Sequence, residues 1–164
     1  MVLDANVKRL NGEKSHIFRV MNLKEVSIGE KLYEQGVQIR RDYLFNGIEN
    51  PDQYLQDPWE KRSIHVVVES NALVLGVGRL TYDDDGNGVV SQMAVKPEFR
   101  GKNVGCIILE HLVKLCVFNS SEKIYMSARE SAIGFYEKLG FNTIGAKFAS
   151  PKTGIVHVSM VLGL

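Results

Sequence analysis

A basic, glycine-containing segment near the middle of the chain has the residue types that bind phosphate. Arg100, Gly101, Lys102 and Gly105 follow a predicted strand and open a predicted helix. A strand–loop–helix junction directs several unpaired backbone N–H groups and the positive end of a helix dipole at one point, where an anion is stabilised. Arginine and lysine add formal charge there, and glycine lets a ligand approach the backbone closely. The segment predicts a diphosphate site, although a connecting loop with ordinary surface charges would explain the same residues.

Hydrophobic periodicity predicts the elements that must hold this loop. Residues 64–69, 72–82 and 89–95 are rich in valine and are separated by turn sequences, which predicts three strands in an antiparallel meander. Apolar side chains recur at helical spacing in residues 28–44 and 104–116, so both segments are expected to be helices. Residues 45–62 are polar and rich in turn dipeptides, which indicates a loop with one helical turn.

The second half of the chain continues the alternation of strand and helix. Ser131 is expected to cap a short helix whose apolar stripe ends at Leu139, and Gly140 is expected to terminate it. Further strands are expected at residues 16–21, 123–128, 141–148 and 155–162. This order indicates an α+β (mixed α/β) fold with a largely antiparallel sheet.

The composition excludes several function classes. The 164 residues include 20 basic and 19 acidic side chains, so the formal charge is +1, which argues against nucleic-acid or anionic-membrane partners. A membrane span is not expected because no apolar stretch is long enough, and Asp4 interrupts the place of a signal peptide. The length fits a single domain over residues 1–164, and the two cysteines suit a reducing, cytoplasmic location.

The sequence contains the beginnings of a metal-binding and a nucleotide-binding motif, but neither motif is complete. The run from Asp83 to Gly88 begins like a calcium loop, but Ala94 stands where the bidentate glutamate is required, which predicts a hairpin turn. Gly76 and Gly78 open a dinucleotide fingerprint that lacks its third glycine. Without a CxxC or HxxxH pair, no metal site is expected.

Two separated segments resemble the GNAT superfamily of N-acetyltransferases. Arg100-Gly-Lys-Asn-Val-Gly105 resembles its acetyl-CoA-binding motif, Arg/Gln-x-x-Gly-x-Gly/Ala, and Ala132-Ile-Gly-Phe-Tyr-Glu-Lys-Leu-Gly-Phe141 is similar to a later motif. The last strand, Gly154-Ile-Val-His-Val-Ser-Met160, resembles a bacterial subgroup related to the ElaA-type proteins. The resemblance implies a GNAT-like fold: a twisted, largely antiparallel sheet of about six or seven strands with splayed middle strands, flanked by about four helices. The cofactor-binding core is expected at about residues 64–142.

The resemblance also implies how acetyl-CoA is bound. Backbone N–H groups of the fourth strand, exposed by a splay or bulge, are expected to hold pantetheine and the thioester oxygen. Asn103 stands at the first motif glycine; asparagine tolerates the left-handed region and caps helices, so we expect the loop to keep its shape with weakened pyrophosphate affinity. Cys106 and Phe135 are expected to pack beside the cofactor. The implied cofactor-binding residues are Met93, Ala94, Val95, Arg100, Gly101, Lys102, Asn103, Val104, Gly105, Cys106 and Phe135.

Tyr136 matches the family's general acid, which protonates the departing sulfur. Its spacing also fits an ordinary buried tyrosine of the apolar stripe. No general base is identified: His157 has the ring pKa best matched to neutral pH, but a histidine in a strand is often packed structure. Arg79 could bind an anionic group on the acceptor or be a surface cation. The other base candidates are Glu69, Ser91, Glu130 and His65.

These residues together predict direct acetyl transfer to a primary amine in a ternary complex. The acceptor is left open between a small amine, an amino acid, a peptide N-terminus and a protein lysine. It is expected to lie across the splayed strands, bordered by the first helix and residues 45–62. The alternative is a non-catalytic acyl-CoA sensor of the same fold, favoured by Asn103 and the lack of a clear base. An exposed edge strand near the C-terminus would permit a homodimer.

Overall fold

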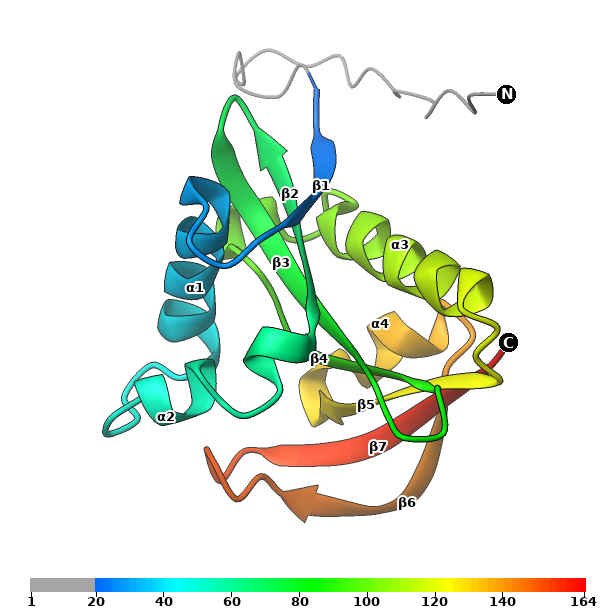
Figure 1. Cartoon of the computed structure of the whole chain (residues 1–164). Helices are drawn as coiled ribbons and strands as arrows, with labels where there is room; N and C mark the ends of the chain where they lie inside the picture. Colours follow the sequence, from blue (N-terminus) through cyan, green and yellow to red (C-terminus); the bar gives the residue numbers. More distant parts are fainter. Residues whose placement is uncertain (1–19) are drawn as a thin grey trace.

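The computed structural model describes residues 20–164, and these residues build one seven-stranded sheet in the order β1-β2-β3-β4-β5-β7-β6 (Figure 1). Most of the strand predicted at residues 16–21 lies outside the described residues, as does the start of the predicted 1–164 domain. The strands are β1 (Asn22–Val26), β2 (Ile64–Ser70), β3 (Leu73–Tyr82), β4 (Gly88–Val95), β5 (Lys123–Arg129), β6 (Asn142–Ala149) and β7 (Val156–Gly163). Every neighbouring pair is antiparallel except β4 and β5, which are parallel. The predicted α+β fold with a largely antiparallel sheet is confirmed.

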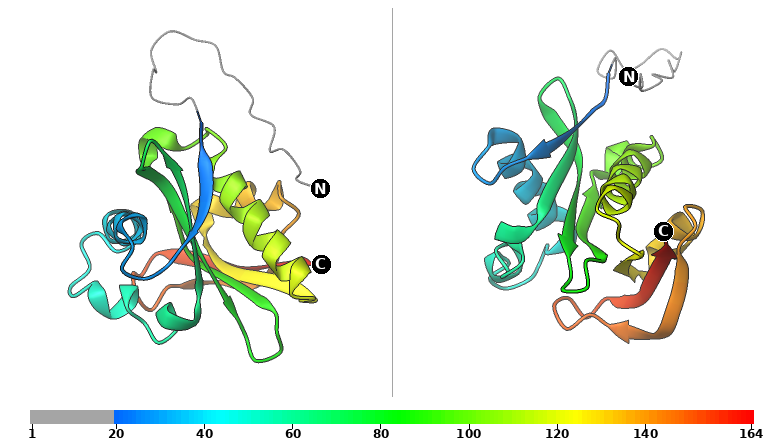
Figure 2. Two further views of the ribbon diagram at one scale, coloured as in Figure 1. Left: turned by 45° about the horizontal axis from the view of Figure 1, so that its top comes forward. Right: turned by 45° about the vertical axis from the view of Figure 1, so that its right-hand side comes forward.

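Helices cover both faces of the sheet, as the views in Figure 2 show. They are α1 (Lys31–Leu44), α2 (Asp52–Leu55), α3 (Val104–Phe118) and α4 (Ile133–Glu137), with short 3₁₀ turns at Glu60–Arg62, Pro97–Phe99 and Glu130–Ala132. Successive side chains of a strand point to opposite faces. Val67 therefore packs in the cluster under α1, whereas Val66 and Val68 pack in the larger cluster under α3. Burial on both faces explains why β2 reads as a continuous valine run.

Two glycines of β3 let α3 approach the sheet. A Cβ on Gly76 would lie 2.7 Å from Cγ1 of Val104, and one on Gly78 would lie 2.6 Å from Cγ2 of Ile108. Such distances are too short for real side chains, so both positions require glycine unless the helix moves away. The incomplete dinucleotide fingerprint is thus explained by helix packing.

Element boundaries differ from the predictions where local turns intervene. The first helix begins at Lys31 instead of residue 28, because Gly29 adopts a φ of 91° and the N–H of Glu30 bonds to the carbonyl of Ser27. Ser131 does not cap the later helix: it lies inside a 3₁₀ turn, and α4 starts after Ala132 without a side-chain cap. That prediction is wrong, whereas Gly140 does end the segment in the left-handed region, with a φ of 92°.

The aspartate-rich turn between β3 and β4 is a hairpin, as predicted. Oδ1 of Asp83 accepts hydrogen bonds from the N–H groups of Asp85 and Asn87, and the N–H of Asp83 bonds to the carbonyl of Asn87. The carboxylate is therefore used to close the turn. All eight residues of β6, the strand at one edge of the sheet, are exposed. The expected exposed edge is present, and the homodimer stays a prediction.

Candidate active site

The two middle strands of the sheet separate soon after they meet. β4 pairs with β5 only through three residues, Gly88–Val90 opposite Ile124–Met126. Beyond these pairs, residues 91–95 of β4 and 127–129 of β5 continue without pairing to one another. The expected splay of the middle strands is confirmed, and it leaves backbone groups of β4 without a strand partner on that side.

A bulge in β4 lies at this opening. Val77 of β3 faces Ala94 and Arg79 faces Ser91, so Gln92 and Met93 together stand opposite Gly78. Gln92 has a φ of 48°, in the left-handed region that non-glycine residues rarely adopt. An extra residue of this kind kinks the strand and redirects its backbone groups. The bulge expected from the family resemblance is present.

The predicted phosphate loop joins β4 to the start of α3. Gly101 and Asn103 both adopt the left-handed region, with φ of 71° and 68°, so the expectation that Asn103 tolerates the glycine conformation is confirmed. Its side chain makes no capping hydrogen bond, so the expected N-cap contact is absent. Lys102 is exposed, with Nζ 5.6 Å from the ring centroid of Phe99, and Nε of Arg100 donates to the carbonyl of Val95.

The first turn of α3, the bulge and α4 converge on one point. A Cβ on Gly105 would lie 3.1 Å from Cζ of Phe135 and 3.5 Å from Cε of Met93. The hydroxyl of Tyr136 donates to Sδ of Met93 at 3.8 Å, and its ring makes an edge contact with Phe135 at 4.9 Å between centroids. Residues from three separate segments of the chain are thus brought together beside the opening between β4 and β5.

Tyr136 is 8% exposed, and burial raises the pKa of its hydroxyl to about 12. The hydroxyl therefore keeps its proton at neutral pH. The ring of Tyr136 packs in the apolar stripe, as expected for an ordinary buried tyrosine. Its hydroxyl contacts Met93 beside the bulge, as expected for the proposed general acid.

Several residues predicted to bind the cofactor have buried side chains, so a ligand could contact them only through their backbone atoms. Val104 is 1% exposed and packs against β3, and Ala94 is buried in the cluster under α1. Cys106 is half-buried. Apolar side chains at these positions are compatible with a site whose donors are N–H groups.

The base candidates are dispersed. Glu69 binds Asn22 and the N–H of Ala72, Glu130 pairs with Lys147, and Nε2 of His65 lies 2.8 Å from the carbonyl oxygen of Glu60. Nδ1 of His157 lies 2.8 Å from the carbonyl oxygen of Ile155, and its ring stacks on Phe148. Within residues 20–164, no hydrogen bond or ion pair links any candidate to Met93 or Tyr136. Ser91 is the candidate that adjoins the bulge.

Arg79 is buried, with 3% of its surface exposed, so it is not a surface cation. Its guanidinium contacts both oxygens of Asp57 at 2.8 Å and Oε2 of Glu60 at 2.7 Å, and Nε donates to the hydroxyl of Ser91 at 2.9 Å. Burial alone would lower the pKa of Arg79, but the bonds to the two carboxylates outweigh burial and raise it. An acceptor anion would have to compete with both carboxylates, which makes Arg79 poorly suited to that predicted role.

Arg79 belongs to a larger, mostly buried polar group that no motif or spacing in the sequence predicts. Arg40 of α1 donates to Oε1 of Glu60 at 2.6 Å and to Oε1 of Gln92 at 3.0 Å. Nε2 of Gln92 in turn donates to the carbonyl of Tyr54 at 2.9 Å. We call this group the bulge cluster: Tyr33, Arg40, Asp57, Glu60, Arg79, Ser91 and Gln92. Its members are up to 59 positions apart, and no local pattern relates them.

The bulge cluster holds the β4 bulge and the 45–62 segment in one arrangement. Side chains of two successive β4 residues, Ser91 and Gln92, are each bonded to a buried arginine. Burial would raise the pKa of Glu60, but hydrogen bonds from Arg40 and Tyr33 lower it to about 2. Glu60 is thus ionised at neutral pH, and the cluster pairs two arginines with two carboxylates.

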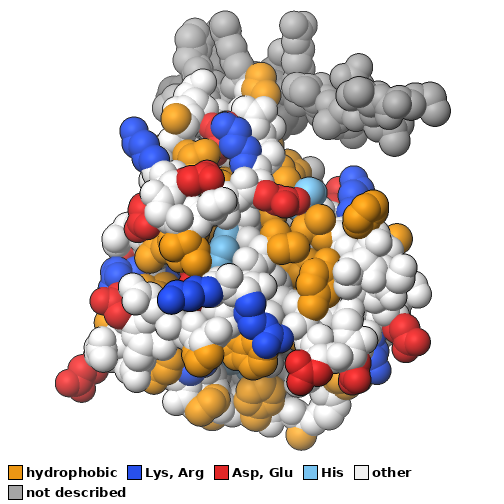
Figure 3. All heavy atoms as spheres, viewed as in Figure 1, with side chains coloured by type: hydrophobic (Ala, Val, Ile, Leu, Met, Phe, Trp, Pro, Cys, Tyr) orange, Lys and Arg blue, Asp and Glu red, His pale blue; other side chains and the backbone are white. Residues whose placement is uncertain are grey.

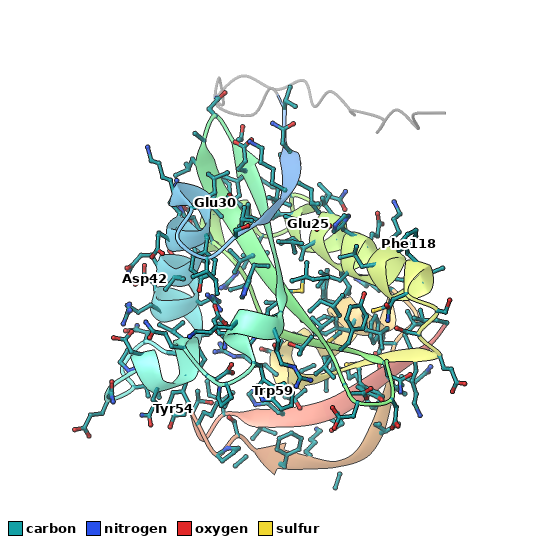
Figure 4. All side chains as sticks on the ribbon, in the orientation of Figure 1. Glu25, Glu30, Asp42, Tyr54, Trp59 and Phe118 are labelled. Carbon is teal, nitrogen blue, oxygen red and sulfur yellow. The ribbon has the colours of Figure 1, made fainter. Side chains whose placement is uncertain are left out.

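Segments that are far apart in the sequence border the opening between β4 and β5. Lys152, in the turn between β6 and β7, lies with Nζ 5.7 Å from the ring centroid of Tyr54 on α2. Figure 4 labels Tyr54 on α2 and Trp59 close to the β7 side of the molecule, and Trp59 is 47% exposed. The expected border of α1 and residues 45–62 is therefore extended by the β6–β7 turn.

On the face shown in Figure 3, basic and acidic side chains are interspersed over the described elements. No helix among residues 20–164 is long and apolar enough to cross a membrane. In the same residues, no three histidine, cysteine or acidic side chains are grouped so as to hold a metal ion.

Residues 31–164 match the family model of the acetyltransferase (GNAT) domain. The chain belongs to the GNAT acetyltransferase family.

Relatives and solved structures agree with this family. The Bacillus subtilis (strain 168) protein named uncharacterized N-acetyltransferase YjcF is 25% identical over 136 residues, covering 83% of this chain and 96% of that protein. Escherichia coli ElaA has the same fold, with a TM-score of 0.72 at 18% identity over 87% of this chain and 99% of ElaA. An aminoglycoside 6'-N-acetyltransferase solved with coenzyme A superposes with a TM-score of 0.73 at 13% identity, over 87% of this chain and 96% of its own.

Proposed function

We propose that this GNAT acetyltransferase moves an acetyl group from acetyl-CoA to a primary amine by direct attack in a ternary complex. Acetyl-CoA supplies an activated acetyl thioester. The amine nitrogen forms a bond to the acetyl carbon as the carbon–sulfur bond breaks, the nitrogen loses a proton and the sulfur gains one. The observation that carries the proposal is the contact of Tyr136 with Met93 beside the bulge in β4.

The chain offers donors for each part of the cofactor. Backbone groups of Met93, Ala94 and Val95 lie where β4 has left β5, so they can bind pantetheine and the thioester oxygen. The first-turn N–H groups of α3 have no partner within the helix and suit the diphosphate, beside Arg100 and Lys102. Gly101 and Gly105 present no side chain to a ligand, and Phe135 packs against Gly105.

Tyr136 is proposed to serve the departing sulfur. Its raised pKa keeps the hydroxyl protonated, and its contact with Met93 directs the proton toward the bulge. A phenol of pKa about 12 is a weak acid, so we expect its contribution to come from a placed hydrogen bond that strengthens as charge develops on sulfur.

His157 is kept as the proposed base. Because Nδ1 lies 2.8 Å from the carbonyl oxygen of Ile155, that nitrogen donates the hydrogen bond and the neutral ring presents Nε2 as the acceptor. His157 faces Arg129 across the β5–β7 pairing, at the end of β5 that borders the opening.

Calorimetry with acetyl-CoA, followed by a thiol-release assay over a panel of amines, tests the proposal. We expect binding and acceptor-dependent release of CoA. The Tyr136→Phe variant should keep acetyl-CoA binding and lower kcat about 10-fold or more, consistent with loss of a hydrogen bond formed in the transition state. Tyr125→Phe is the matched control, since its hydroxyl binds Asp83 in the hairpin turn. Unchanged turnover in Tyr136→Phe would remove this residue from the mechanism.

The competing function is an acyl-CoA sensor, and the side chain of Asn103 in the phosphate loop is the observation that favours it. Tight binding of acetyl-CoA without CoA release from any amine would support the sensor. Absence of acetyl-CoA binding would contradict both functions.

A further inference from the structure

Arg129 is a half-buried cation at the end of β5, where this strand has already separated from β4. Its Nη2 donates to the carbonyl oxygens of Tyr43 at 3.3 Å and Leu44 at 3.1 Å, in the last turn of α1. The side chain therefore reaches from β5 to the end of α1. Both elements border the region where the acceptor is expected.

The guanidinium of Arg129 is not neutralised by any carboxylate in the described part of the chain. Nε and Nη1 have no hydrogen-bond partner among residues 20–164, and no carboxylate of these residues forms an ion pair with it. The adjacent Glu130 is paired with Lys147 on β6. No buried side-chain nitrogen or oxygen in the described part of the chain lacks a partner, so these two nitrogens are accessible to solvent and to a ligand.

The two fully buried arginines differ from Arg129 because carboxylates neutralise them. Arg40 and Arg79 are each 3% exposed, and each is bonded to a buried carboxylate of the bulge cluster. Among residues 20–164, the hydrogen-bond partners of Arg129 are two carbonyl oxygens. Burial lowers the pKa of Arg129, and the like charge of Arg100 lowers it further. Partial burial beside a like charge is unfavourable unless an anion balances it.

We propose that Arg129 binds the carboxylate of the acceptor, so that the preferred acceptors of this enzyme are primary amines that also carry a carboxylate. Nε–H and the Nη1 hydrogens have no partner among the described residues, so each can donate a charge-assisted hydrogen bond to a carboxylate oxygen. The hydrogen bonds of Nη2 to α1 fix the orientation of the guanidinium, which lowers the entropy lost when an acceptor binds. The proposal rests on the proposed acetyl transfer and names its acceptor class.

A phosphate of acetyl-CoA is the other anion that could meet Arg129, since Arg100 lies nearby. The two sources make different kinetic predictions. A carboxylate on the acceptor affects KM for the amine, whereas a cofactor phosphate affects the Kd of acetyl-CoA. Both must therefore be measured on the same variants.

The experiment compares amino acids with their carboxamides, which have the same amine and no carboxylate, as acceptors for the whole chain. We expect kcat/KM to be about 10- to 100-fold higher for the amino acid, the range of a charged hydrogen bond. Arg129→Gln should reduce this preference to within about threefold and leave the Kd of acetyl-CoA unchanged, while Arg129→Lys should keep part of it. Lys123→Gln is the control, because Lys123 is an exposed cation at the other end of β5, beside the ring of Tyr125, and should leave the preference intact.

The outcomes separate this proposal from the proposed function. Acetylation of carboxamides as fast as amino acids by the wild-type protein would overturn the acceptor class while leaving acetyl transfer in place. An Arg129→Gln variant with a raised Kd for acetyl-CoA and an unchanged amine preference would assign Arg129 to the cofactor. If Arg129→Gln loses the fold through its contacts with α1, the wild-type comparison still decides the acceptor class. Absence of transfer to every amine would instead contradict the proposed function.

Discussion

Replacing Arg40 by methionine is the most direct test of the bulge cluster. The substitution keeps an unbranched side chain but removes two hydrogen bonds to Glu60 at 2.6 and 3.0 Å and one to Gln92 at 3.0 Å. Glu60 is 4% exposed and would stay buried with one fewer cation. Breaking a buried ion pair by removing one partner costs about 3–5 kcal/mol. We expect the lower end, about 3 kcal/mol, because Arg79 and Tyr33 still bind the carboxylate.

The lowered pKa of Glu60 gives an independent value for the loss of stability expected in Arg40→Met. Its lowering from 4.5 to about 2 corresponds to about 3 kcal/mol of stabilisation of the ionised form at neutral pH, at about 1.4 kcal/mol per pKa unit. Much of this comes from Arg40, whose hydrogen bond is the largest of the effects that lower the pKa. Arg40→Met should thus lower Tm by about 6–12 °C, at roughly 2–4 °C per kcal/mol for a domain of this size.

Arg41→Met is the matched control, since Arg41 is the next residue and pairs with Asp52 at 2.5 Å. The two side chains of this pair are 35% and 55% exposed. Exposed pairs contribute about 0.2–1 kcal/mol, so Tm should fall by no more than about 4 °C. Thermal unfolding of both variants measures the difference. Because Arg40 also holds Gln92, acetyl transfer should slow about tenfold in Arg40→Met alone. Equal shifts in Tm for the two variants would refute the assignment of the cluster as a buried, mutually dependent unit.

Two further predictions concern Glu60 and His157. The depressed pKa of Glu60 means that its contribution to the free energy of unfolding is complete above about pH 4.5 and is lost as the pH falls toward 2. Acid unfolding of Glu60→Gln should lack this part of the pH dependence, and an acid-unfolding curve identical to that of the wild type would contradict the low pKa. His157→Gln should lower kcat/KM for the amine about 100-fold while keeping the Kd of acetyl-CoA, if Nε2 accepts the amine proton; an unchanged kcat/KM would exclude His157 as the base.

The sequence by itself determined the parts of this protein that depend on near neighbours. The meander of β2, β3 and β4 follows from valine runs and turn residues, and the loop before α3 follows from charges and glycines within six consecutive positions. The conformation of Asn103 was predictable because a left-handed φ is a property of one residue and its neighbours. The helical spacing of apolar residues also predicted that the ring of Tyr136 is buried, and it packs against Phe141; the proposed role of its hydroxyl came only from the family resemblance.

The tertiary structure alone decided which distant groups meet. The sequence left the role of Arg79 open between a contact to the acceptor and a surface cation. In the structure Arg79 is buried and bonded to two carboxylates, because residues 45–62 bring Asp57 and Glu60 against it. Arg40 and Gln92 are 52 positions apart, and Arg129 is 85 from Leu44, so no periodicity could relate them. Polar side chains of this kind are placed by the packing of α1 and by the divergence of β4 from β5. The sequence by itself predicts the segment proposed to bind the cofactor, because its residues are consecutive. Tertiary packing determines which arginines are neutralised by carboxylates and which are not.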